Sequence, residues 1–228
     1  MNRNYPRTLL LLNIITLGAL LVATWMVFFY APVEAVMGMV QKVFYFHVAS
    51  TWTGMLGFLV AAISGGTYLA TKDTKWDRVA LAGVEIGIFF TLIGIITGSI
   101  WARPVWNTWW TWDPRLTTTT IMVLIYAAYL LLRQGIDEQE KRARFAAVYA
   151  IVGFITVPMT FLPIRYYRTI HPVLIDPNEG FGLGPGMMTA FFLSLASFTV
   201  LYIVLLMHRY RLERMKEEVD DLKERLGY

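Results

Sequence analysis

Residues 101 to 117 read W-A-R-P-V-W-N-T-W-W-T-W-D-P-R-L-T, and the rest of the chain is best interpreted from this stretch. It contains five of the chain's eight tryptophans: Trp101, Trp106, Trp109, Trp110 and Trp112. It also carries two arginines and an aspartate, and a long apolar run lies on each side of it. This combination is typical of a membrane surface, where an indole buries its ring while its N–H stays hydrated. The stretch therefore predicts a membrane protein with an aromatic segment at one surface of the bilayer.

Two prolines suggest a local shape for this stretch. Pro104 favours an extended backbone at Arg103, because the proline ring crowds the preceding residue. The pair Asp113-Pro114 is typical of a helix start, in which the carboxylate caps the helix and proline takes the first helical position. We therefore expect a helix to begin at Asp113.

The tryptophans between these prolines suggest a surface that binds something flat. Three of them have the spacing of one helical face: Trp106, Trp109 and Trp110. A short helical turn over 105–113 would make them a flat aromatic shelf beside the guanidinium groups of Arg103 and Arg115. The alternative is an aromatic belt that only anchors two helices, but belts place one or two indoles at each helix end. We favour the binding surface.

The composition of the whole chain supports a membrane protein. Of its 228 residues, 57% are hydrophobic and 16% are charged, which is less charge than a soluble domain carries. A helix crosses a bilayer with roughly 20 apolar residues. Six runs of about this length predict an all-α polytopic membrane protein with six transmembrane helices: 8–30, 47–70, 79–100, 113–132, 145–164 and 186–207. The first run ends in bulky aromatic residues and not in a small-residue cleavage site, so we expect it to be retained.

The segments between the runs predict further features. Small residues four apart indicate close packing of the second and third spans: Gly57, Ala61 and Gly65 in the second, and Gly83/Gly87 and Gly94/Gly98 in the third. Pro158 is expected to kink the fifth span. The 165–185 connector is rich in turn residues and should be irregular. We divide the chain into a six-helix membrane domain, 1–208, with its outer aromatic segment at 101–117, and a C-terminal tail, 209–228, whose apolar spacing predicts a helix.

The basic residues predict the orientation in the membrane. Six spans put both termini on one side, and 15 of the 20 lysines and arginines lie on that side. The other five lie on the opposite side: Lys42, Arg103, Arg115, Arg165 and Arg168. Because basic residues are enriched in cytoplasmic loops, both termini are predicted to be cytoplasmic. The aromatic segment and the 31–46 and 165–185 connectors then share the outer face.

Two of the three histidines fall on this outer face. His47 opens the second span and His171 lies in the 165–185 connector, whereas His208 is predicted to be a solvated residue at the cytoplasmic end of the sixth span. Each outer histidine alone is more often a satisfied polar residue than a metal ligand. Their convergence with indoles and arginines favours ligation. Glu85 is the one acid within a span, and we favour a structural contact for it over a proton path.

The pattern W-x-x-P-x-W-x-x-W-W-x-W-D-x-R-L-T resembles the signature of the cytochrome c assembly, or WWD, family of haem-handling membrane proteins. The family usually has glycine where this chain has Ala102 and Asn107. The resemblance implies that the segment binds haem b without covalent attachment, and the absence of cysteine excludes a C-x-x-C-H linkage. The residues that the resemblance implies for haem binding are Trp101, Arg103, Trp106, Trp109, Trp110, Trp112, Asp113 and Arg115.

The resemblance also implies an iron-ligand set. In the family, external histidines that flank the signature are axial ligands, and by position these are His47 and His171. The side chains suit such a cargo: imidazoles occupy the two axial positions, indoles cover the macrocycle, and arginines pair with the propionates.

Within the family, the length, the six spans and the single signature are most similar to the haem-handling subunit of the multi-protein maturation pathway. That similarity implies a non-enzymatic protein of the bacterial inner membrane, which holds haem at the periplasmic face and presents it to the haem chaperone CcmE. The implied partners are the transporter subunits CcmA and CcmB and the small protein CcmD. The chain has no P-loop motif, so any ATP hydrolysis would belong to a partner.

Two other function classes stay open at the level of sequence. One is a permease that moves haem itself, against which stand the lack of a second intramembrane charge to pair with Glu85 and the lack of an inverted repeat. The other is a redox subunit that holds its haem for electron transfer. Both histidines lie near irregular backbone at one edge of the membrane, which suits handover better than electron transfer.

Overall fold

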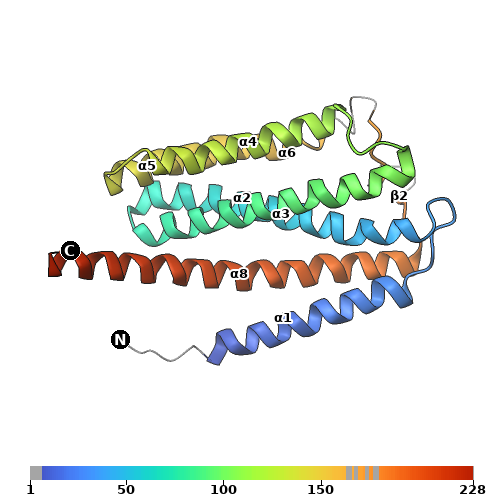
Figure 1. Cartoon of the computed structure of the whole chain (residues 1–228), viewed down its shortest axis with the longest axis horizontal. Coiled ribbons are helices and arrows are strands. Elements are labelled where there is room, and N and C mark those ends of the chain that lie inside the picture. Colours follow the sequence, from blue (N-terminus) through green and yellow to red (C-terminus); the bar gives the residue numbers. More distant parts are fainter. Residues whose placement is uncertain (1–6, 163–165, 167–168, 173–174, 177–179, 228) are drawn as a thin grey trace.

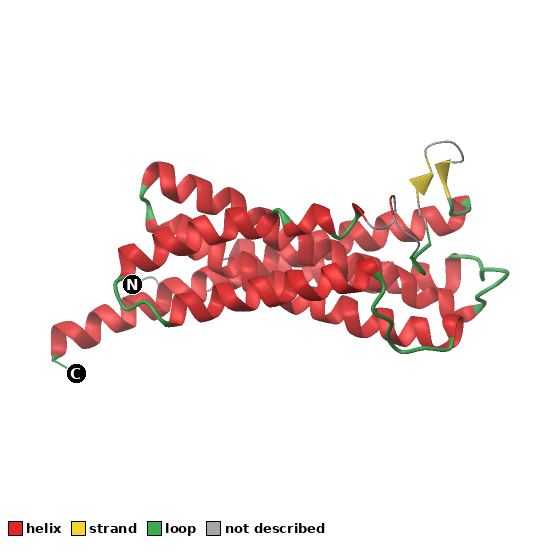
Figure 2. Ribbon diagram, turned by 90° about the horizontal axis from the view of Figure 1, so that it is seen from above, coloured by secondary structure: helices red, strands yellow, loops and turns green. Residues whose placement is uncertain are grey.

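The computed structural model describes every residue of the chain except 1–6, 163–165, 167–168, 173–174, 177–179 and 228. Its elements, in order, are α1 (Arg7–Trp25), the π-helical turn η1 (Met26–Tyr30), the 3-10 turn η2 (Met39–Gln41), α2 (Lys42–Thr71), α3 (Thr74–Trp106), α4 (Pro114–Gln134), α5 (Gln139–Phe154), α6 (Thr156–Met159), β1 (Ile175–Asp176), β2 (Gly180–Phe181) and α8 (Pro185–Leu226). Within the described ranges, six helical segments are long and apolar enough to cross a membrane, and they lie roughly side by side in one bundle (Figures 1 and 2). The predicted all-α polytopic fold is confirmed.

Helices α2 and α3 form the centre of the bundle through their small residues. A methyl group added to Gly57 would lie 2.5 Å from the carbonyl oxygen of Gly83, so the two backbones are in direct contact. Phe58 stacks on Tyr126 of α4, with ring centroids 3.7 Å apart. The small-residue spacing in the sequence therefore correctly predicted this close pairing.

The fifth span is broken close to the predicted proline. Helix α5 ends at Phe154, and α6 resumes at Thr156 and contains Pro158. Proline removes a backbone donor and crowds the preceding turn, which accounts for a break one turn before it. The chain then enters the irregular connector, in which β1 and β2 form a two-stranded antiparallel hairpin.

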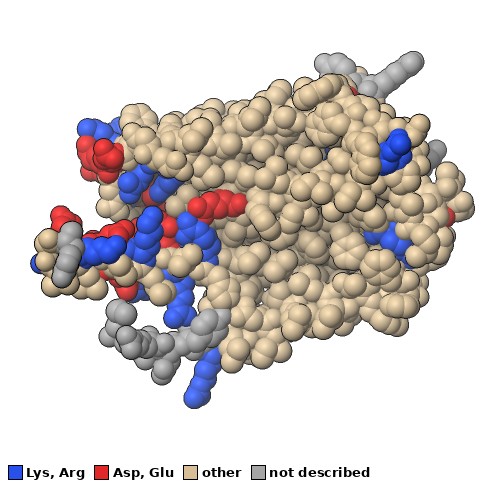
Figure 3. Space-filling view, in the orientation of Figure 1, with Lys and Arg blue, Asp and Glu red and all other residues tan. Residues whose placement is uncertain are grey.

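Charged side chains gather at the end of the bundle where α1 begins and α8 ends (Figure 3). Arg133 of α4 makes two hydrogen bonds to Asp77 of α3, of 2.5 and 2.9 Å. Arg209 of α8 lies 2.5 Å from Glu85 of α3. The prediction that no second charge pairs with Glu85 is therefore wrong, because Arg209 does. The structural contact that we favoured for Glu85 agrees with this pairing. The sequence could not show it, because Arg209 is far away along the chain.

Helix α8 continues past the predicted boundary at 208/209 without a break, so the sixth span and the tail are one helix. The apolar residues of the tail are exposed: Leu212, Met215, Val219, Leu222 and Leu226. Both described chain ends lie at the charged end of the bundle (Figure 1). Of the basic residues used to predict orientation, Arg3, Arg165 and Arg168 lie outside the described residues.

Candidate functional site

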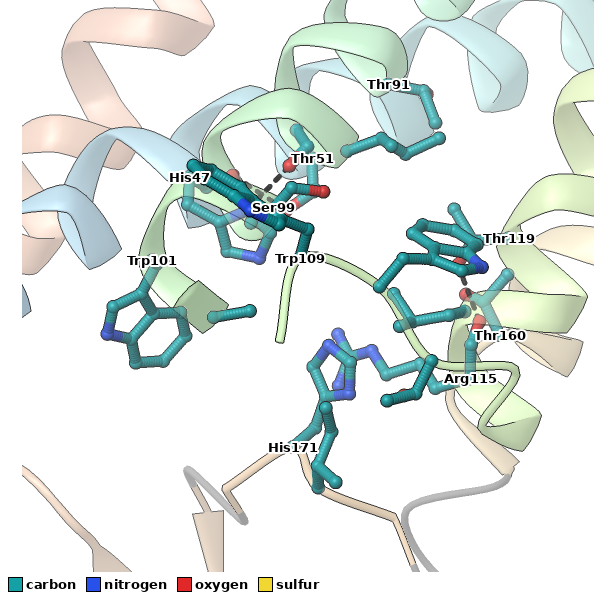
Figure 4. A pocket seen from close by; sticks show the side chains of 18 of the residues that line it. His47, Thr51, Thr91, Ser99, Trp101, Trp109, Arg115, Thr119, Thr160 and His171 are labelled. Carbon is teal, nitrogen blue, oxygen red and sulfur yellow. Dashed lines mark hydrogen bonds between the residues drawn. The ribbon is translucent and has the colours of Figure 1, made fainter. Parts of the chain in front are cut away.

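A pocket opens at the opposite end of the bundle from the charged residues, between α2, α3, α4 and the chain around residue 171 (Figure 4). Seven of the ten predicted site residues line it: His47, Trp101, Trp106, Trp109, Trp110, Arg115 and His171. The other three do not line it: Arg103, Trp112 and Asp113. Its open volume is about 60 Å³.

His47 is held in the pocket by α3. It lies in the second turn of α2, because this helix begins at Lys42 and not at His47 as predicted. Its Nδ1 lies 2.9 Å from the carbonyl oxygen of Gly94, an acceptor that carries no hydrogen. Nδ1 must therefore be the protonated nitrogen, and Nε2 keeps a free lone pair. Gly98, one turn further along α3, leaves room for the ring, since a methyl group there would lie 2.9 Å from the His47 Cε1 atom.

His171 reaches the pocket from the other side (Figure 4). Its Nδ1 lies 3.3 Å from the hydroxyl of Thr169 and 3.8 Å from Oδ2 of Asp113. Burial lowers the pKa of His171 to about 4, and the nearby Arg115 guanidinium lowers it further. The imidazole is therefore neutral at physiological pH, which is the form that coordinates a metal.

Asp113 is the predicted helix cap, and the structure confirms that role. Its Oδ1 accepts the backbone N–H of Leu116 at 2.9 Å, and Pro114 takes the first position of α4. Its Oδ2 accepts a hydrogen bond from the hydroxyl of Thr169 and another from the backbone N–H of Ile170, at 3.2 Å. Burial alone would raise the pKa of Asp113, but these hydrogen bonds, that of Thr169 above all, lower it below its ordinary value. Asp113 is thus an ionised group that joins α4 to the connector.

The tryptophans do not form the flat shelf that we predicted. Helix α3 continues through Arg103 and Pro104 to Trp106, so Arg103 is helical, and residues 107–113 are not. The expected extended backbone at Arg103 and the expected helical turn over 105–113 are therefore both wrong. Pro104 lies in the last turn of α3, where it removes one backbone hydrogen bond and crowds the carbonyl of Ile100, and the helix ends two residues later.

The indoles meet edge to face around the pocket. The rings of Trp101 and Trp106 are 5.3 Å apart at 62°, and those of Trp110 and Trp112 are 5.5 Å apart at 84°. Trp101 is buried, whereas Trp109 and Trp112 are 59% and 72% exposed. The site therefore has a fixed indole in its wall, Trp101, and an exposed, non-helical rim formed by residues 107–113.

The two arginines of the stretch have different surroundings. The guanidinium of Arg103 donates to the backbone oxygen of Asn107 at 2.9 Å and to the side-chain oxygen of the same residue, so it closes the end of α3. Arg115 is half-buried among the pocket residues, lies over the ring of Phe161 at 5.7 Å, and extends towards His171 (Figure 4).

The two positions where the family usually has glycine, Ala102 and Asn107, place different demands on the backbone. Asn107 has a positive φ of 54° and ends α3, so this position requires the left-handed conformation that glycine adopts freely. Asparagine is the next most suitable residue, since its short polar side chain tolerates this conformation. Ala102 lies inside α3 at the pocket wall, where no special backbone conformation is needed.

Sequence reasoning missed the residues that orient the histidines. Gly94 and Gly98 carried only a packing signal, and the Gly94 contact with His47 is a backbone contact that no side-chain motif reveals. Thr169 carried no signal beyond its position two residues before His171. Within the described part of the chain, no three histidine, cysteine or acidic side chains gather as a metal site.

Comparison with known proteins gives a consistent result. A family model described as "Heme exporter protein C" matches residues 3–225 of the chain. The "Heme exporter protein C" of Bradyrhizobium diazoefficiens is 30% identical over 194 residues, which cover 85% of this chain and 74% of that protein. The protein of the same name from Rhodobacter capsulatus is 30% identical over 202 residues, covering 87% and 83% respectively. The protein of that name from Haemophilus influenzae is 29% identical over 192 residues, covering 83% and 77%.

Proposed function

The chain belongs to the haem exporter protein C family of multi-pass membrane proteins that handle haem for cytochrome c maturation, and from this we propose that it holds haem b at the periplasmic face of the bacterial inner membrane and presents it to the chaperone CcmE. The observation that carries the proposal is the meeting of His47 and His171 in one pocket, from separate parts of the chain. Both rings have their Nδ1 engaged within the protein, so both can offer Nε2 to an iron. Haem supplies an iron with two open axial positions and two anionic propionates.

The remaining pocket residues support the same cargo. Arg115 is the half-buried cation that lines the pocket and would pair with a propionate, whereas Arg103 is engaged with Asn107 at the end of α3. Trp101 and Trp106 would contact the macrocycle from a fixed position, and Trp109 from the exposed rim. Asp113 acts from outside the pocket, through its contacts with the connector.

Haem entry requires the pocket to widen. Sites for small molecules occupy roughly 300–1,000 Å³, and the open volume here is about 60 Å³. The rim is the part that can move, because Trp109 and Trp112 are exposed and belong to the non-helical segment 107–113. A rim that opens to admit haem also leaves an edge of the cargo accessible to a second protein, which suits handover.

A permease is the alternative, and the cavities argue against it. A charged cavity of about 460 Å³ at the other end of the bundle reaches Glu85. It shares no lining residue with the histidine pocket. The buried stack of Phe58 and Tyr126 lies in the core between them. This separation of the two cavities favours a protein that holds haem on one side of the membrane. We propose that it does so in an assembly with CcmA, CcmB and CcmD, in which any ATP hydrolysis belongs to a partner.

The orientation is tested by topology reporters. We propose that the six-helix domain 1–208 places its pocket in the periplasm and that the tail 209–228 lies in the cytoplasm, because the sequence assigns 15 of the 20 basic residues to the side of the two termini. A reporter fused after Pro114 or after Ile170 should be periplasmic, and one at Glu138 should be cytoplasmic. A periplasmic Glu138 would place the pocket on the wrong side for the chaperone.

The function is tested by the visible spectrum of the purified protein before and after incubation with CcmE. The wild type should carry six-coordinate low-spin haem and lose it to CcmE. A variant with both His47→Ala and His171→Ala should lack that spectrum. If the double variant keeps the wild-type spectrum, histidine ligation is wrong, and if haem stays on the wild type in the presence of CcmE, presentation is wrong.

A further inference from the structure

We propose that Asp113 and Thr169 form a positioning device that fixes the ring orientation and the tautomer of His171. This inference rests on the proposed function, since it assigns a task to the aspartate of the tryptophan-rich signature within the same site. It differs from the prediction made from sequence, in which Asp113 contacts the haem.

The hydroxyl of Thr169 is fully occupied by its neighbours. A hydroxyl has one hydrogen to donate and two lone pairs to accept with. Thr169 donates its hydrogen to Oδ2 of Asp113 and accepts the backbone N–H of His171 at 3.2 Å. Its remaining lone pair lies 3.3 Å from Nδ1 of His171. Since the only hydrogen of the hydroxyl is already given to the carboxylate, Nδ1 must be the donor, and Nε2 is left free for the cargo.

The carboxylate of Asp113 fixes this arrangement to the membrane domain. Oδ1 accepts the Leu116 N–H at the start of α4, and Oδ2 accepts from Thr169 and Ile170. The Asp113 side chain is 9% exposed and lies outside the pocket lining. These three contacts hold Thr169 and Ile170 against the first turn of α4.

The need for such a device follows from the position of His171. His47 belongs to the rigid helix α2, and neutral groups of α3 hold its Nδ1: the Gly94 carbonyl at 2.9 Å and the Thr97 hydroxyl at 3.4 Å. His171 belongs to irregular chain, where no helix constrains the ring. A carboxylate behind a ligating imidazole fixes its orientation and makes it a stronger electron donor. The two imidazoles are thus unequal, and His171 is the one whose ligand strength depends on a charge.

Three variants test the device. Asp113→Asn keeps a helix-capping oxygen but removes the charge, because asparagine caps about as well as aspartate. Thr169→Val removes the hydroxyl from a residue that caps no helix, and Thr169→Ser restores it. The measurements are the rate of haem loss to excess apomyoglobin, the midpoint potential of the bound haem, and the thermal midpoint of the haem-free protein.

We expect Asp113→Asn and Thr169→Val to lose haem about 10- to 100-fold faster than the wild type, the usual effect of removing a group behind a ligating histidine. Their midpoint potentials should rise, because a less electron-donating ligand favours the reduced iron. Thr169→Ser should return both values close to those of the wild type. The thermal midpoint of Thr169→Val should stay close to that of the wild type.

The proposal fails if Thr169→Val keeps the wild-type rate of haem loss and midpoint potential. It also fails if Thr169→Ser behaves like Thr169→Val, because the hydroxyl would then not be the active group. These outcomes differ from failure of the proposed function, in which His171→Ala itself leaves the spectrum of the bound haem unchanged.

Discussion

Replacing Gly98 with alanine tests whether α3 controls the orientation of His47. The added methyl group would lie 2.9 Å from the His47 Cε1 atom, whereas ordinary contact begins at 3.4 Å, so the ring must move by about 0.5 Å. Gly94 lies one turn away on the same face of α3. A ring pushed away from Gly98 therefore also moves away from the Gly94 carbonyl, and the 2.9 Å hydrogen bond lengthens to about 3.4 Å. At that length little of the bond remains.

A hydrogen bond of this kind contributes about 0.5–1.5 kcal/mol, so the haem affinity of Gly98→Ala should fall about 2- to 12-fold. The assay is a haem titration of the purified protein in detergent, followed by its visible absorption. The control is Gly66→Ala in α2, where an added methyl group meets no atom within 4 Å. If Gly98→Ala binds haem as tightly as Gly66→Ala does, α3 does not orient His47 in the way that the structure indicates.

Three further outcomes are expected. In haem titrations, Trp109→Ala should weaken binding more than Trp112→Ala, because only the first of these exposed indoles lines the pocket; equal losses would contradict this. Gly57→Ala should lower the free energy of unfolding by about 1–3 kcal/mol, since the methyl group meets the α3 backbone, and a thermal midpoint no lower than that of Gly66→Ala would refute the close pairing. His208→Ala should leave the visible spectrum of the bound haem unchanged, because His208 pairs with Asn13 of α1 towards the charged end, and an altered spectrum would reopen the assignment of the ligands.

The positions of the helices followed from the sequence because they depend on signals local to the chain. Apolar runs of membrane-spanning length predicted the six spans, and Asp113-Pro114 predicted the start of α4. Glycines four apart predicted the contact of α2 with α3. Each of these features is decided by residues within a few turns of one another, where hydrophobic length and capping chemistry dominate.

The shape of the aromatic segment did not follow from the sequence. Pro104 suggested an extended chain, but it lies inside the last turn of α3. The helix ends instead at Asn107, which has a left-handed backbone. Arg103 donates two hydrogen bonds to Asn107 and so closes this end of the helix. A local preference near a helix end is weak, and the hydrogen bonds available to the folded chain outweigh it.

The orientation of the histidines was decided by the tertiary structure alone. The sequence named His47 and His171 as partners by their type and by their expected side of the membrane. It could not show that the Gly94 carbonyl would hold one ring, or that Thr169 and Asp113 would hold the other. Two of these contacts join residues that are far apart in the chain, His47 with Gly94 and Thr169 with Asp113, and the first uses a backbone oxygen that every residue possesses. Side-chain identity could therefore predict which groups meet at this end of the bundle, while only the packing of α2, α3 and α4 determined which of their atoms face the cargo.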